Sequence, residues 1–130
     1  MQNTKIITDE LYMELLQHGT EQFPFQYYYE DITKFDMRIM DWHWHREFEL
    51  ATLVEGTAHC SIGHMNMILH EGDGLFINSG IFHSFQASES GILPNILFSP
   101  EFIAPESSLI QDKYVSPFLT GDISHIIFHR

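Results

Sequence analysis

The stretch that decides the fold brings two histidines and a carboxylate close together along the chain: His43-Trp44-His45-Arg46-Glu47-Phe48-Glu49. Successive side chains of a β-strand point to opposite faces, so His43 and His45, which are two residues apart, share a face. Glu49 lies four residues after His45, and Gly56 follows seven residues later. The spacing therefore predicts one strand with two converging imidazoles and a second strand that carries the carboxylate and ends near Gly56.

A second stretch supplies a third histidine: Gly72-Asp73-Gly74-Leu75-Phe76-Ile77-Asn78-Ser79-Gly80-Ile81-Phe82-His83. Across a sheet from the first stretch, His83 would complete a cage of three imidazoles and one carboxylate: His43, His45, His83 and Glu49. Such mixed ligands suit Mn, Fe, Co, Ni or Zn and leave open positions for water or substrate. Hydrogen bonds inside a polar barrel could instead hold the same side chains, so a divalent metal (Zn, Ni, Mn or Fe) is a hypothesis.

Short strand-like runs separated by turn residues continue from residue 23 to residue 98. Polar and apolar residues alternate from Thr57 to Ile62, and Gly63-His64 suits a type II′ hairpin. Strands with turn signals every ~8–12 residues are typical of an all-β sandwich or barrel rather than of βαβ units. We therefore expect one all-β domain over residues 1–130, with its core at about 23–98.

Short helices are expected at both ends. Capping residues at Thr8, apolar residues along one face and a stop at Gly19 predict a helix over 8–19. The tail 100–130 is expected to be part helical and part extended, with a helix from Ser107 to Tyr114 that Pro117 terminates. Because chain termini are usually polar and frayed, the apolar residues just before Arg130 lead us to expect a fragment of a longer protein.

The two histidine-containing stretches resemble the two conserved motifs of the cupins. The first stretch fits in full, from His43 to Gly56, whereas the second departs from the pattern at Asn78, where cupins usually have proline, and at Ala87, where the motif often ends in asparagine. The resemblance implies a double-stranded β-helix, a jelly-roll barrel, with the ligand positions His43, His45, Glu49 and His83 retained.

Longer segments resemble the sensor domain of AraC-type transcription regulators: Asp41 to Leu50, Leu15 to Phe25, and the tail from Phe98 to Val115. In that family the cupin binds a small effector, often a sugar, and mediates dimerisation. A separate C-terminal pair of helix-turn-helix motifs binds DNA. The resemblance therefore implies a homodimer that contacts DNA only through a domain absent from this chain.

Charge and composition exclude other classes of protein. Six Lys+Arg against 18 Asp+Glu give a formal net charge of −12, and the cations are scattered, so direct nucleic-acid binding is not expected. The single cysteine, Cys60, permits no internal disulfide and indicates a reducing, cytoplasmic location. No apolar run approaches ~18 residues, so no membrane span is expected.

Aromatic and basic residues near the histidines are candidates for effector binding. Sugar and aromatic ligands favour aromatic walls with a few polar groups, and the candidates here are Phe25, Tyr27, Trp42, Trp44 and Arg46. Aromatic residues on strands are more often core residues. Arg46 could neutralise Glu47 or Glu49, or hold an anionic ligand.

The expected function is effector binding and dimerisation in an AraC-type regulator, without enzymatic activity. No catalytic residue is assigned, because no further acid, base or nucleophile stands out. The alternative is a stand-alone metal-dependent cupin enzyme, a dioxygenase or an isomerase, in which the metal ion would activate oxygen, water or substrate.

Overall fold

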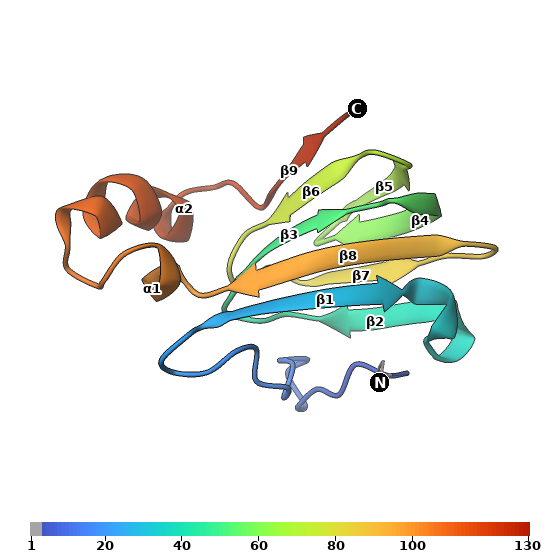
Figure 1. The fold of residues 1–130 in the computed structure, drawn as a ribbon, viewed down its shortest axis with the longest axis horizontal. Helices are drawn as coiled ribbons and strands as arrows, with labels where there is room; N and C mark the ends of the chain where they lie inside the picture. The colour runs from blue at the N-terminus through green and yellow to red at the C-terminus, as the bar shows by residue number, and fades with distance from the viewer. Residues whose placement is uncertain (1–3) are drawn as a thin grey trace.

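The computed structural model describes residues 4–130, in which nine strands pair in the antiparallel sense (Figure 1). One sheet contains, in spatial order, β1 (Phe25–Asp31), β8 (Gly91–Phe98), β3 (Phe48–Thr52), β6 (Gly74–Ile77) and β9 (His125–Phe128). The other contains β2 (Ile39–His43), β7 (His83–Gln86), β4 (Glu55–Ile62) and β5 (Met65–His70). The all-β prediction is confirmed.

The start of β4 joins the two sheets. There Gly56 pairs with Gly91 of β8, whereas the remainder of β4 pairs with β5 and β7. The predicted hairpin turn after β4 contains Gly63, whose φ of 56° suits a primed turn.

The apolar core draws residues from both sheets. Buried and partly buried residues alternate along β8, as the period of two for a strand requires. Leu93 of β8 packs in the same buried cluster as Ile77 of β6 and Phe85 of β7. Cys60 belongs to this cluster, and burial raises the pKa of its thiol.

The predicted helix over 8–19 does not form. The Asp9 carboxylate accepts hydrogen bonds from the backbone N–H groups of Leu11 and Met13, which holds a turn in place of a helix start. The backbone N–H of Glu14 donates to the carbonyl of Trp44 at 2.9 Å, so the segment bonds to another part of the chain. The leucines of the expected apolar face are largely exposed, among them Leu11 at 72%.

Short helices follow β1 and β8. The 3₁₀ turns are η1 (Ile32–Lys34) and η2 (Asp36–Arg38), and the C-terminal elements are α1 (Pro100–Ile103), η3 (Gln111–Val115) and α2 (Ser116–Thr120). The prediction that Pro117 ends the tail helix is wrong. The π-helical turn η3 precedes Pro117, which therefore occupies the first turn of α2, where no backbone donor is needed. None of the helices in residues 4–130 has the length and hydropathy needed to cross a bilayer.

Candidate functional site

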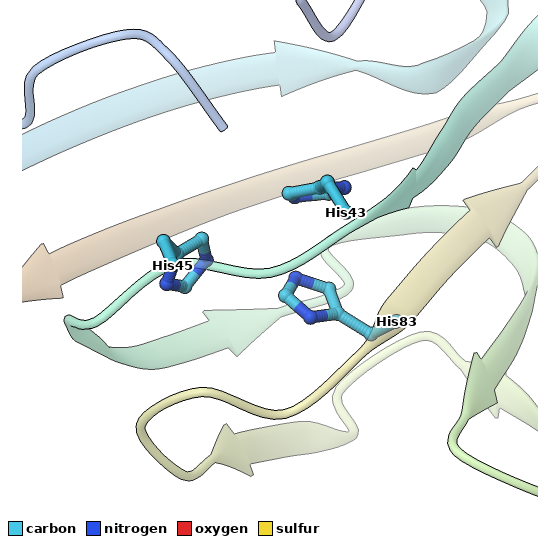
Figure 2. A group of neighbouring side chains, drawn as sticks. All are labelled: His43, His45 and His83. Atoms are coloured by element: carbon cyan, nitrogen blue, oxygen red, sulfur yellow. The ribbon is translucent and has the colours of Figure 1, made fainter. Parts of the chain in front are cut away.

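Three buried imidazoles converge where β2 and β7 meet (Figure 2). His43 ends β2, His45 follows it, and His83 begins β7 directly opposite His43. Their candidate ligand atoms all lie within 4.8 Å of one another, and each residue is at most 3% exposed. A register shift between Met40 and His43 accompanies this placement. Three imidazoles at this separation could hold one metal ion.

Backbone carbonyls fix the orientation of all three rings. The Nδ1 atom of His43 lies 2.7 Å from the carbonyl oxygen of Asp41, that of His45 lies 3.0 Å from Glu47, and that of His83 lies 2.7 Å from Ile81. A carbonyl can only accept, so each Nδ1 carries a hydrogen and donates it. The Nε2 atoms are then left for the centre of the site, which is the arrangement found around metal-ligating histidines.

Glu49 supplies a buried carboxylate beside these rings. Nε2 of His45 donates to its Oε1 at 3.1 Å, whereas Nε2 of His83 lies 3.6 Å away, beyond hydrogen-bonding distance. Burial would raise the pKa of Glu49, but the hydrogen bond from His45 and the nearby imidazoles lower it well below its usual range. Burial likewise opposes a charge on His45, but Glu49 outweighs this effect and raises the pKa of His45. Glu49 is therefore ionised and available as an oxygen ligand.

His83 has an unsatisfied polar atom. Its side chain is fully buried, and within residues 4–130 its Nε2 atom has no hydrogen-bond partner. A buried polar group without a partner costs roughly 1–3 kcal/mol, so such atoms call for an explanation. Burial, followed by the neighbouring His83 and His45, lowers the pKa of His43 well below its ordinary value. A neutral imidazole and an unpartnered nitrogen are both suited to binding a metal ion.

A small cavity of about 30 Å³ adjoins His43, His45 and Glu49. Its other walls come from the N-terminal segment, β1 and the core: Ile6, Glu14, Leu16, His18, Tyr28, Glu30, Phe35, Met40, Asn95 and Leu97. One water molecule needs roughly 10–15 Å³ on this measure. The cavity therefore has room for an ion with a water molecule, but not for a sugar in this arrangement.

The structure places all five predicted effector residues outside this cavity. Phe25 packs against Phe102 at a ring-centroid distance of 5.1 Å, and Tyr27 is 54% exposed, because both lie on the outer face of β1. Trp42 stacks on Phe82 with ring centroids 4.5 Å apart.

The other two candidates also have partners away from the cavity. Trp44 donates its indole N–H to the carbonyl of Leu11 at 2.9 Å. Arg46 pairs with Glu101 at the surface, not with the neighbouring glutamates that the sequence suggested.

Sequence reasoning missed a second polar layer beside the histidines. The Tyr28 hydroxyl lies 2.5 Å from Nδ1 of His18, and Nε2 of His18 lies 2.7 Å from the Glu14 carboxylate. The His18 ring is 5.6 Å from the His45 ring, so the two layers are in contact. No helix forms around His18, so its ring is held by Tyr28 and Glu14 and not by a helix terminus. The alternation along β1 signalled a polar face with Tyr28 and Glu30, but not which face is internal.

Replacing Glu30 with glutamine is expected to stabilise the metal-free fold at pH 8 by on the order of 1–3 kcal/mol, with little effect at pH 5. Burial outweighs the hydrogen bond from Asn95 and raises the pKa of Glu30 from 4.5 to about 7. The folded protein thus binds the proton of Glu30 more tightly than the unfolded chain does. The protonated side chain contributes to stability at low pH, and this contribution is lost as the pH rises from 4.5 through about 7. Each tenfold difference in proton affinity is worth about 1.4 kcal/mol.

Urea unfolding at both pH values, with a chelator present, measures this effect. The exposed Glu89→Gln is the matched control and should leave stability unchanged at both pH values. Equal effects of Glu30→Gln at pH 5 and pH 8 would contradict the prediction.

Comparison with known proteins relates this geometry to a family. Residues 32–122 match the family model of the AraC-like ligand binding domain. The chain is 30% identical over 115 residues to an uncharacterized HTH-type transcriptional regulator, YdeC, of Bacillus subtilis (strain 168). That alignment covers 87% of this chain and 39% of the relative, so the chain spans well under half of the relative's length.

Solved structures support the fold. The chain is similar to an RmlC-like cupin from Shewanella frigidimarina, with a TM-score of 0.52 and 22% identity over 58% of this chain and 66% of that one. It is also similar to protein NMB1881 from Neisseria meningitidis, with a TM-score of 0.50 and 19% identity over 58% of this chain and 75% of that one. The likeness to the RmlC-like cupin confirms the predicted cupin fold.

Proposed function

Because the chain belongs to the family of AraC-like ligand-binding domains, we propose that it is the effector-binding and dimerisation part of a transcription regulator. We place the effector site at the cavity beside His43, His45 and Glu49. The relative YdeC is named as an HTH-type regulator, and this chain covers 39% of it. DNA binding then belongs to a separate domain, which agrees with the net charge of −12 and with a cytoplasmic location.

The observation that carries this proposal is the fully buried Nε2 atom of His83, which has no partner in the described part of the chain. It lies among rings whose outer nitrogens are all bonded to the backbone, so the inner nitrogens are oriented for a ligand. The donor set fits a divalent metal ion held by His43, His45 and His83. Glu49, whose Oε1 lies 3.1 Å from Nε2 of His45 and 3.6 Å from Nε2 of His83, could add an oxygen ligand. A bound ion would supply a Lewis acid that polarises an oxygen atom of a second ligand.

Regulation follows if the effector binds two arrangements of the dimer with different affinities. A ligand shifts an equilibrium only by its difference in affinity for the two states, and such coupling is typically about 5–150-fold. Effector binding in this domain would therefore change how the linked DNA-binding domains are presented to DNA.

Full-length regulator with His43, His45 and His83 all changed to alanine is expected to lose its response to effector. A DNA fragment selected in vitro serves as the probe, and its affinity is measured by fluorescence anisotropy with and without metal salts, pentoses, hexoses or small carboxylates. The control changes three exposed histidines, His59, His64 and His70, to alanine. We expect a change of at least about fivefold in wild type and control, and none in the buried triple variant. A wild-type response in that variant would refute the proposal.

A stand-alone metal-dependent enzyme, such as a dioxygenase or an isomerase, is the second candidate. The partly buried, hydrogen-bonded set Glu14–His18–Tyr28 favours it, because these groups beside a metal ion could move a proton. It predicts turnover in the 130-residue chain that is lost in His45→Ala.

A further inference from the structure

The cavity has an unusual balance of charge. Within residues 4–130 it is lined by three carboxylates, Glu14, Glu30 and Glu49, and by neither lysine nor arginine. The three come from separate parts of the chain, namely the N-terminal segment, β1 and β3. Arg46, which lies three residues before Glu49 in sequence, pairs with Glu101 at the surface.

Each carboxylate accepts a hydrogen bond from a histidine or asparagine side chain. Glu14 accepts from His18, Glu49 accepts from His45, and Glu30 accepts from the side-chain amide of Asn95 at 3.0 Å. The side chains of Glu14 and Glu49 are only 7% and 5% exposed. Buried carboxylates are seldom left without a compensating cation or a set of hydrogen bonds. An anionic ligand in this cavity would add to the repulsion among these carboxylates, which no lysine or arginine of the lining offsets.

The volume of the cavity, like its charge, favours a metal ion over an organic anion. Pockets for organic ligands commonly measure roughly 300–1,000 Å³, whereas this cavity measures about 30 Å³. A positive charge is what the three carboxylates favour, and the converging imidazole nitrogens select a transition metal over a hard alkaline-earth ion.

We infer that a divalent transition metal ion is itself the effector, and that Glu14 and Glu30 make the cavity selective for cations. This inference rests on the proposed function and names its ligand class. Neither residue needs to touch the ion. Glu14 is a positioning residue that acts through His18, whose ring contacts that of His45, whereas Glu30 adds a carboxylate to the cavity wall.

The first test uses the metal alone. Zn²⁺, Ni²⁺ and Mn²⁺ are each titrated into the chelator-treated chain by calorimetry, with Glu14→Gln, Glu14→Asp and the exposed Glu10→Gln as variants. Glu14→Gln removes the charge at nearly constant shape and is expected to weaken binding about tenfold. Glu14→Asp retains the charge and should recover most of the affinity, which a purely structural role would not predict. Wild-type affinity in Glu14→Gln, or no recovery in Glu14→Asp, would overturn the role given to this residue.

The second test asks whether the ion is the signal. In the full-length regulator, metal alone is expected to change DNA affinity at least about fivefold, and pentoses, hexoses or small carboxylates are expected to add nothing. If metal binds but only a sugar or a carboxylate changes DNA affinity, the inference is wrong and the proposed function stands. If no ligand changes DNA affinity, the proposed function fails with it.

Discussion

Changing His83 to glutamine is expected to weaken divalent metal binding by more than about 100-fold. Loss of a group that only orients a metal ligand already costs about 10–100-fold, so loss of one of three imidazole ligands should cost more. His83 is the ring whose Nε2 atom has no partner within residues 4–130, so the change removes a ligand without breaking an existing hydrogen bond of that atom. Glutamine fills similar space in a fully buried position.

Equilibrium dialysis with Zn²⁺ after chelator treatment measures this loss. His59→Gln, at an exposed position of β4, is the matched control and should bind as the wild type does. Near-ultraviolet circular dichroism of the metal-free proteins verifies that both variants retain tertiary packing. A folded His83→Gln variant with unchanged affinity would show that the three imidazoles do not form the metal site.

Replacing Gly56 with alanine is expected to destabilise the fold by more than about 4 kcal/mol, a loss that only a few mechanisms produce. Gly56 has a φ of +88°, and an added Cβ atom would lie 2.0 Å from the backbone oxygen of Ser90. The positive φ alone costs an L-residue roughly 1–2 kcal/mol, and the clash with backbone must be relieved by moving strands. Gly56 also pairs with Gly91 where β4 joins the two sheets, so this movement would separate them.

Gly63→Ala separates these two effects. Gly63 also has a positive φ, +56°, but no described atom lies within 4 Å of an added Cβ. Its loss should therefore be limited to the conformational cost of roughly 1–2 kcal/mol. Urea unfolding of both variants and the wild type provides the comparison. Equal losses would show that the contact with Ser90 carries no penalty.

The histidine cluster is the part of the molecule that local spacing determines best. The i, i+2 relation of His43 and His45 depends only on the period of a strand, and the turn residues between strands fix where the chain reverses. With the motif around His83, these features indicated the cupin fold, and the longer segments that flank them indicated the AraC family; the comparisons confirm both.

The outcome for the N-terminal segment depended on a local turn and on a contact with a distant part of the chain. Its apolar spacing and capping residues indicated a helix, but the hydrogen bonds of Asp9 and the bond from Glu14 to Trp44 compete with helical bonding. Trp44 is distant in sequence, so helix propensity was overruled by tertiary structure.

The two faces of β1 also separate what the sequence determines from what the tertiary structure decides. The sequence by itself determined that Phe25 and Tyr27 share one face and that Tyr28 and Glu30 share the other, because side chains alternate along any strand. Only the tertiary structure decided that Tyr28 and Glu30 are internal, since that choice depends on which side of β1 the other sheet and the N-terminal segment cover. The sequence therefore predicted the histidine cluster, and the assembled fold alone brought the carboxylates of Glu14 and Glu30 beside it.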